Sequence, residues 1–176
     1  MYVRPGKMID AKEIVDIAAS RYGEALYWHI RRIVVSREDA EDAMQETFLK
    51  IFTKAHTLSD GEGSLRPWLY RIATNEALMV LRRRTRLFES IDSLSDELCD
   101  MLSGESAPDA DKTSVLFQKA TLRLPGSQRL AFYLRYYDNL PYSEIAKITG
   151  KSEATLRTNY HYAVESIKKY LKDSTI

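Results

Sequence analysis

Residues 142–157 read YSEIAKITGKSEATLR, and the fold of the C-terminal part of the chain follows from this stretch. Its first half has the apolar spacing of a short amphipathic helix, with the small Ala146 where two helices must cross closely. Gly150 supplies a tight turn, and Ser152 can cap a second, basic helix. This order predicts a helix-turn-helix, whose second helix enters the major groove of DNA. A plain helical hairpin with a solvated face has the same local pattern, and we favour DNA binding.

The last helix is expected to run from Ser152 to about Lys172, with two distinct faces. One stripe recurs at three- and four-residue steps and is assigned to the core, while the opposite face is free to meet a ligand. The core stripe is Leu156, Tyr160, Ala163, Ile167 and Leu171, and the free face carries Arg157, Thr158, His161 and Tyr162.

Long helical patterns also dominate the N-terminal part of the chain. A first helix is expected from Ile14 to Val34, with a break or bend at Gly23, where glycine costs about 1 kcal/mol relative to alanine. Ser36 then has the sequence context of a helix cap. The helix it starts would run to about Ala55 with Ala40, Met44, Phe48 and Ile51 facing inward, and a third helix begins near Pro67.

Composition excludes several classes of protein. The chain has 176 residues, a net charge of +1 and 44% apolar residues, enough to bury a core. No apolar run approaches the roughly 20 residues that span a bilayer, and no charged-then-apolar leader opens the sequence. We therefore expect a soluble, unsecreted, cytoplasmic protein. The single Cys99 and three scattered histidines exclude a Cys/His zinc cluster, and we expect no metal and no cofactor.

Charge is distributed unevenly along the chain. Residues 1–84 carry 14 basic and 12 acidic side chains, residues 85–117 carry 2 and 8, and residues 118–176 carry 10 and 5. Two basic segments are thus joined by an acidic one. Basic segments can face nucleic-acid phosphates, which an acidic segment avoids.

The expected fold class is all-α, with two small helical domains joined by an acidic linker and a helix-turn-helix in the C-terminal domain. The domains would span residues 10–86 and 114–172 and share little core. Residues 87–113 lose the helical period and are interpreted as the linker. Within it, Ile91, Leu94, Leu98 and Met101 have the spacing of a short docking helix.

Two further surfaces could bind a partner. Asp42, Gln45 and Glu46 form a polar stripe with the apolar Leu49, which suits a protein partner or a solvated helix face equally well. Aromatic residues beside arginines in residues 64–78, followed by the Arg82–Arg86 cluster, suit single-stranded nucleic acid. For Trp68 itself we favour a core position, and the arginines alone would also suit a helix C-terminus.

The sequence does not favour an enzyme. It has no glycine-rich phosphate loop and no Gly-x-Ser-x-Gly nucleophile motif. Asp39 or Asp42 can share a helix face with Glu46, but carboxylates at that spacing are common and usually only solvated. We therefore expect no catalytic residues and no small-molecule substrate.

The order of the segments resembles bacterial sigma factors. Residues 36–52 (SREDAEDAMQETFLKIF) resemble their core-polymerase-binding helix, and residues 66–75 (RPWLYRIATN) with Leu81–Arg84 resemble their promoter −10 segment. Residues 124–171 resemble their −35-reading domain. The presence of these two domains alone resembles the extracytoplasmic-function (ECF) group.

This resemblance implies a function and partners. Such proteins bind RNA polymerase core, bring it to a promoter and help to open the duplex by holding a flipped base of the non-template strand. The implied partners are the clamp helices of the largest polymerase subunit, the flap of the second largest, double- and single-stranded promoter DNA, and an anti-sigma factor. The matching core-binding positions are Asp42, Gln45, Glu46 and Leu49.

The resemblance also implies the DNA-binding residues. For the −10 element they are Ser59, Asp60, Gly61 and Glu62 in a loop that holds the flipped base, Asn75 with its amide, and Arg82, Arg83 and Arg84 on phosphate. For the −35 element they are Ser152, Thr155, Arg157, Thr158, His161 and Tyr162. Many relatives carry basic residues at the positions of Asn159 and Tyr162, so Tyr162 would instead meet thymine methyls or phosphate.

Two other classes remain open on the residues alone. One is a stand-alone helix-turn-helix regulator with a helical N-terminal partner-binding domain, and the other is a protein–protein adaptor. A regulator of that kind binds its duplex without polymerase, usually as a dimer on a palindrome, and an adaptor shows no salt-dependent DNA binding.

Overall fold

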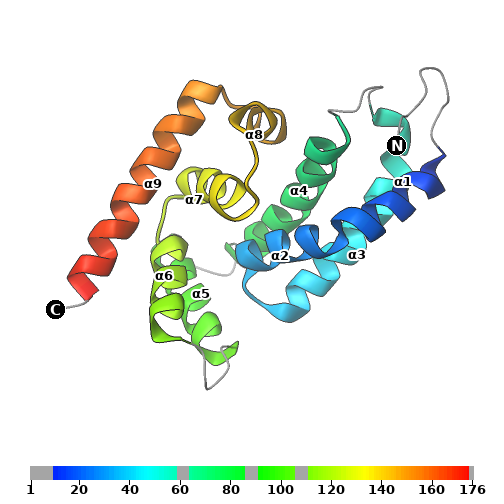
Figure 1. Ribbon diagram of the computed structural model, residues 1–176. Coiled ribbons are helices and arrows are strands. Elements are labelled where there is room, and N and C mark those ends of the chain that lie inside the picture. The colour runs from blue at the N-terminus through cyan, green and yellow to red at the C-terminus, as the bar shows by residue number, and fades with distance from the viewer. Residues whose placement is uncertain (1–9, 59–63, 86–90, 106–110, 175–176) are drawn as a thin grey trace.

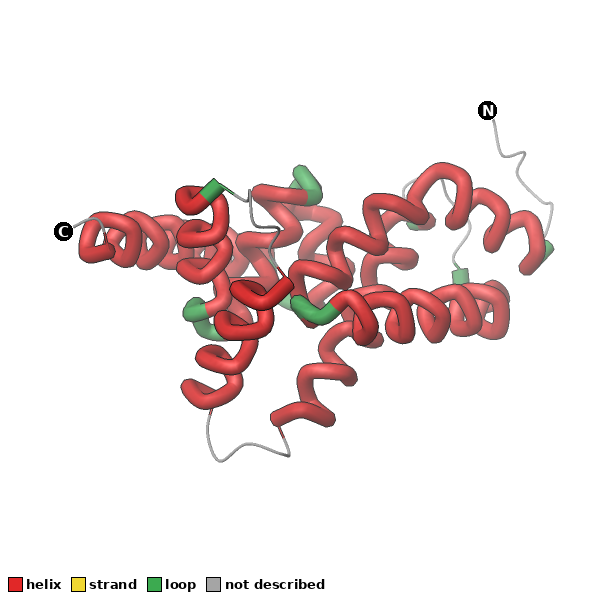
Figure 2. Tube along the Cα trace, turned by 90° about the horizontal axis from the view of Figure 1, so that it is seen from below, coloured by secondary structure: helices red, strands yellow, loops and turns green. Residues whose placement is uncertain are grey.

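A computed structural model describes residues 10–58, 64–85, 91–105 and 111–174, with side chains given except at 85, 91–94 and 105. Every element in this part of the chain is a helix or a helical turn, which confirms the all-α fold class (Figure 2). The helices labelled α1 to α4 gather on one side and α7 to α9 on the other, with α5 and α6 below them in the view of Figure 1.

The first predicted helix is interrupted. It consists of α1 (Ala11–Ile17), a π-helical turn (Ala18–Tyr22) and α2 (Gly23–Val34). A π-helical turn inserts an extra residue into the hydrogen-bond ladder, so the apolar stripe shifts its face between α1 and α2. The break therefore comes just before Gly23, close to where the sequence predicted it.

The second and third predicted helices are present as α3 (Arg37–Lys54), followed by a 3-10 turn (Ala55–Thr57), and α4 (Leu65–Thr85). The hydroxyl of Ser36 accepts a hydrogen bond from the Asp39 N–H at 3.3 Å, which is the predicted cap. The inward face of α3 is rotated from the prediction. Ala43 and Thr47 are buried beside α2 and α4, where helices approach closely, whereas Met44 and Phe48 are only half-buried.

The acidic segment expected as a linker contains a helix longer than the short one predicted. Helix α5 spans Ile91–Glu105 and packs against α6 (Lys112–Leu122). Leu98 is fully buried and Cys99 nearly so. Apolar residues on one face therefore tie this acidic segment to the rest of the protein, although its composition is that of a solvated connection.

The C-terminal half follows the predicted order. Helix α7 (Gly126–Phe132) continues into a π-helical turn (Tyr133–Tyr137), and then come α8 (Tyr142–Thr149) and α9 (Glu153–Ser174). The aromatic rings of the turn pack around Phe132, which stacks on Tyr136 and on Tyr160 of α9. This aromatic cluster anchors the last helix to α7.

The two halves of the molecule pack on one another, although the sequence predicted little shared core. Helix α4 lies against α8, and α2 lies against the π-helical turn of residues 133–137. Polar side chains carry much of this contact: His29 meets Asp138, and Arg66 meets Glu144. The division into domains of residues 10–86 and 114–172 stays a prediction.

Candidate nucleic-acid interface

Helices α8 and α9 form the predicted helix-turn-helix. Gly150 takes the left-handed conformation, with φ of 71°, and its N–H donates to the carbonyl of Ala146 at 2.8 Å. The hydroxyl of Ser152 then accepts from the Thr155 N–H at 3.2 Å and caps α9. Ile145 and Leu156 are buried between the two helices. The turn and the cap therefore set the direction in which α9 leaves the domain.

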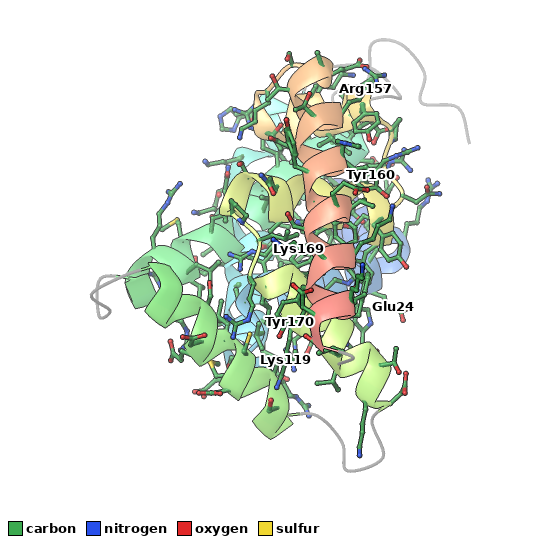
Figure 3. The ribbon with its side chains drawn as sticks, turned by 90° about the vertical axis from the view of Figure 1, so that its left-hand side faces the viewer. Glu24, Lys119, Arg157, Tyr160, Lys169 and Tyr170 are labelled. Carbon is green, nitrogen blue, oxygen red and sulfur yellow. The ribbon has the colours of Figure 1, made fainter. Side chains whose placement is uncertain are left out.

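The predicted reading face of α9 is exposed. Arg157, Thr158, His161 and Tyr162 all reach solvent, and Tyr162 is 56% exposed. Figure 3 shows Arg157 near one end of α9, with Lys169 and Tyr170 toward the other. The hydroxyl of Thr158 donates to the backbone carbonyl of Ala154 at 3.1 Å, so its oxygen stays free to accept from a base edge or a water.

Two residues that sequence reasoning missed hold Arg157 in place. Its guanidinium lies 4.8 Å from the ring centre of Tyr142, and its Nη2 donates to Glu153 at 3.2 Å. Arg135 lies 5.2 Å from the same ring. Two cations close to one aromatic ring make this corner of the helix-turn-helix a good partner for phosphate. Tyr142 and Glu153 both lie in the stretch of residues 142–157, and the four-residue step from Glu153 to Arg157 was a usable signal, whereas no sequence signal joined Arg135 to Tyr142.

Helix α4 presents part of the predicted −10 surface. Asn75, Arg82 and Arg83 are exposed. Arg84 is placed differently: its guanidinium binds Asp39 of α3 and, at 3.2 Å, Glu97 of α5. It would meet phosphate only after leaving these carboxylates. The predicted residues Ser59 to Glu62 lie outside the described residues.

Trp68 is half-buried at the start of α4, in partial agreement with the core position favoured for it. Its indole N–H donates to the Thr57 hydroxyl at 3.2 Å, which ties α4 to the 3-10 turn after α3. Glu76 of α4 forms an ion pair with Lys50 of α3 and is only 6% exposed. These two contacts fix α3 against α4. The polar stripe on α3 (Asp42, Gln45, Glu46 and Leu49) therefore has a fixed position relative to Asn75 on α4.

The candidate partner-binding stripe on α3 is open to solvent. Asp42, Gln45 and Glu46 are exposed, and Leu49 is 56% exposed. Phe52, one helical turn beyond Leu49, is 55% exposed and extends the stripe. Large apolar side chains surrounded by polar ones are typical of protein–protein contact sites. Phe52 was not predicted from the sequence, although its three-residue step from Leu49 was a usable signal.

Metal and membrane features are absent from the described part of the chain. The described residues contain no group of three or more His, Cys, Asp or Glu side chains that could hold a metal ion. Among the same residues, none of the helices combines the length and apolar character needed to span a membrane.

Both halves of the chain match models of known protein families. The family model for Sigma-70 region 2 matches residues 18–87, and the model for Sigma-70 region 4 matches residues 114–167. The ECF RNA polymerase sigma factor SigW of Bacillus subtilis is 28% identical over 180 residues, covering 97% of this chain and 94% of that protein. The RNA polymerase sigma-H factor of Pseudomonas aeruginosa is 28% identical over 170 residues, covering 92% and 88%.

Two solved structures share the fold. The sigma factor RpoE of Bartonella quintana, in complex with the anti-sigma factor NepR, matches with a TM-score of 0.66 and 23% identity, covering 85% of this chain and 91% of that one. CnrH, in complex with the cytosolic domain of CnrY, matches with a TM-score of 0.67 and 20% identity, covering 93% and 90%.

A helix-turn-helix joined to a helical unit that matches region 2 defines a sigma-type transcription initiation protein. The chain belongs to the sigma-70 family, and within it to the ECF sigma factors. It therefore binds RNA polymerase core, directs it to promoters and helps to open the DNA. Like the rest of its family, it is a specificity subunit and not an enzyme.

Proposed function

We propose a division of labour among three surfaces of this ECF sigma factor. The stripe on α3 docks on the clamp helices of the largest polymerase subunit, α4 reads the −10 element, and the exposed face of α9 reads the −35 element. The observation that carries this proposal is the simultaneous exposure of all three sets: Gln45 and Leu49 on α3, Asn75 on α4, and His161 and Tyr162 on α9.

The −10 role of α4 requires no bond chemistry. An unpaired base offers its Watson–Crick edge, which the Asn75 amide can meet with a donor and an acceptor. Arg82 and Arg83 follow on the same helix and can meet phosphate. The open duplex only has to be bound more tightly than the closed one for the equilibrium to shift. The residues Ser59 to Glu62 are proposed to hold the flipped base.

The −35 role of α9 combines phosphate and base contacts. Arg157, held by Tyr142 and Glu153, suits a phosphate, since it lies at the edge of the reading face beside a second cation, Arg135. Thr158 and His161 lie nearer the middle of that face and can reach base edges. Ser152 and Thr155 sit at the cap of α9, where backbone N–H groups also favour phosphate.

The partners follow from this division. Besides the clamp helices, we propose contact of the C-terminal half with the flap of the second largest subunit, and control by an anti-sigma factor. Support for the latter is that one structural neighbour, RpoE of Bartonella quintana, is a sigma factor in complex with the anti-sigma factor NepR. We also propose that the protein acts in the cytoplasm, where RNA polymerase meets DNA.

The test is transcription in vitro with purified core polymerase and a library of genomic promoter fragments. We expect start sites to appear only when both proteins are present, and the mapped promoters to share a −10 and a −35 element. A protein that binds a palindromic duplex alone as a dimer, with no transcription on adding core polymerase, would contradict the proposal.

A further inference from the structure

A cavity lies where α2 meets α5, α6 and the π-helical turn of residues 133–137. Its volume is about 180 Å³. A dry apolar cavity of about 150 Å³ can take up one benzene molecule, so this space fits a ligand with a single ring. None of the described residues that line it belongs to the three surfaces proposed for binding polymerase and promoter. The cavity is therefore a feature that the proposed function does not use.

Aromatic rings and guanidinium groups line the part of the cavity that reaches solvent. Trp28 of α2 is 49% exposed, and the ring of Tyr27 meets it edge-on with 5.4 Å between the ring centres. Tyr137 is half-buried, and the guanidinium of Arg32 lies 4.4 Å from the centre of its ring. Arg31 also lines the cavity. Rings and cations this close together suit a flat ligand that carries a negative charge.

The inner end of the cavity is buried and uncharged. Val35 and Leu122 are almost fully buried there, and so are Thr121 and Tyr133. The Thr121 hydroxyl donates to the carbonyl of Gln118 at 2.7 Å, so the Tyr133 hydroxyl, 3.1 Å away, donates to Thr121. Neither hydroxyl keeps a hydrogen for an anion. This end therefore suits the ring of a ligand, whose charge belongs beside the arginines.

A strained residue forms part of the cavity wall. Val35 has a φ of 67° and a ψ of −46°, and the N–H of Ser36 donates to the carbonyl of Val34 at 2.8 Å, which closes a γ-turn. A γ-turn with positive φ is rare, and a β-branched side chain makes it less favourable still. Strained backbone of this kind is concentrated at binding and catalytic sites. The turn is thus a second observation that points to the cavity.

The charged groups at the cavity determine the chemical class of the ligand. The described residues that line it include two arginines and no acid. Arg32 gives one N–H to Asp138 at 3.3 Å, and a guanidinium has five. A carboxylate can accept two parallel hydrogen bonds from such a group. An uncharged ring would not pair with the arginines, and a small aliphatic acid would not fill the space between the rings.

We propose that this cavity binds an aromatic carboxylate with one ring. The ring lies between Trp28 and Leu122, and the carboxylate lies beside Arg31 and Arg32. Because the site shares no residue with the surfaces proposed for polymerase and promoter, binding can be measured on the free full-length chain. The result does not depend on whether those surfaces are assigned correctly.

Nuclear magnetic resonance with benzoate as the probe tests both binding and location. The chain has two tryptophans, so an isotope-labelled sample shows two indole N–H signals, which Trp68→Phe assigns. Trp68 donates to Thr57 and does not line the cavity. We expect benzoate to shift the Trp28 signal saturably and to leave the Trp68 signal in place. Acetate, which lacks the ring, and benzyl alcohol, which lacks the charge, should bind at least about tenfold more weakly.

Variants separate the contributions of the charge and of the ring. Arg31→Gln and Trp28→Leu should each weaken benzoate binding by about tenfold or more, as measured by titration calorimetry. Lys12→Gln removes a charge from an exposed position of α1, and Phe52→Leu removes a ring that is 55% exposed on α3. Both controls should bind benzoate as wild type does. Circular dichroism checks that each variant stays helical.

Three results would overturn the proposal. The first is a wild-type Trp28 signal that does not respond to benzoate, or that moves together with the Trp68 signal. The second is benzyl alcohol or acetate binding as tightly as benzoate. The third is a folded Arg31→Gln protein with wild-type affinity for benzoate. The first two need no variant, so they decide the matter even where a substitution prevents folding.

Discussion

Single side chains on α3 offer the most direct probe of polymerase docking. Asp42 and Gln45 are exposed, on a helix whose opposite face carries the buried Ala43 and Thr47, so they can be changed without disturbing the core. Leu49 and Phe52 add the apolar area that a stable contact needs.

We expect Asp42→Ala combined with Gln45→Ala to weaken binding of core polymerase by about tenfold or more. Each polar contact in such an interface contributes roughly 1 kcal/mol, which is why the double variant is the better probe. A fluorescence titration of labelled protein with core polymerase measures the loss. Glu13→Ala removes an exposed acid from α1 and should leave the affinity unchanged. A folded double variant with wild-type affinity would remove these residues from the interface.

At the −35 element, Arg157→Ala and His161→Ala should impair promoter binding in different ways. Loss of a phosphate contact at Arg157 weakens all promoters alike and lowers the salt slope of binding by about 1. Loss of a base contact at His161 costs roughly 1–3 kcal/mol at one position and relaxes the preference there. Selection from a promoter library with a randomised −35 element distinguishes the two. A changed base column with Arg157→Ala and none with His161→Ala would reverse the assignment.

Among whole elements, the helix-turn-helix depends on one backbone conformation. Gly150 has a positive φ that an L side chain adopts only with strain, and it ends α8. Gly126 offers a matched comparison, because it lies in the first turn of α7 with nothing within 4 Å of an added Cβ.

We expect Gly150→Ala to lower the free energy of unfolding by about 1 kcal/mol and to weaken −35 binding as the entry of α9 shifts. Gly126→Ala should instead leave stability unchanged or raise it by up to about 1 kcal/mol, since alanine is the better helix former. Urea denaturation of both variants measures this. Equal effects at the two glycines would mean that the turn conformation is not limiting.

Helix α4 should matter for opening the duplex more than for finding it. Asn75→Ala is expected to reduce the number of unpaired thymines that permanganate detects in promoter complexes. Binding of the same variant to a −35 duplex should stay within about twofold of wild type. The reason is that Asn75 is exposed on α4 and does not belong to α9, which is proposed to read the −35 element. Glu13→Ala, at an exposed position of α1 outside the three proposed surfaces, is the control. Loss of both activities to the same degree would assign Asn75 a structural role.

At the scale of the whole molecule, the contact between the halves depends on a buried histidine. His29 joins α2, α4 and the segment before α8 through Thr74 and Asp138. Removing it leaves buried polar groups without one of their partners, and such groups are costly.

We therefore expect His29→Ala to lower the free energy of unfolding by about 2–3 kcal/mol. His29→Gln, which keeps one donor and one acceptor, should recover part of the loss. Urea denaturation followed by circular dichroism provides the measurement, and His56→Ala, at an exposed position in the 3-10 turn, is the control. A His29→Ala protein as stable as wild type would show that the buried cluster contributes little to holding the halves together.

Much of what the sequence determined follows from local patterns of helix caps, turns and apolar spacing. The cap at Ser36, the turn at Gly150 and the extent of α8 depend on a few neighbouring residues, and each is found where it was predicted. The three- and four-residue apolar steps likewise placed Leu156 and Ala163 inward and Tyr162 outward. These features are legible in sequence because helix periodicity and capping chemistry act over one or two turns.

Contacts between distant segments were decided only by the tertiary structure. The burial of Ala43 in place of Met44, the capture of Arg84 by Glu97 and the pairing of His29 with Asp138 all depend on which helices meet. His29 and Asp138 are 109 positions apart, and no local pattern relates them. The sequence around a charged residue does not show whether its partner is DNA, solvent or another helix. Only the packing of the chain determines which of these partners lies within reach.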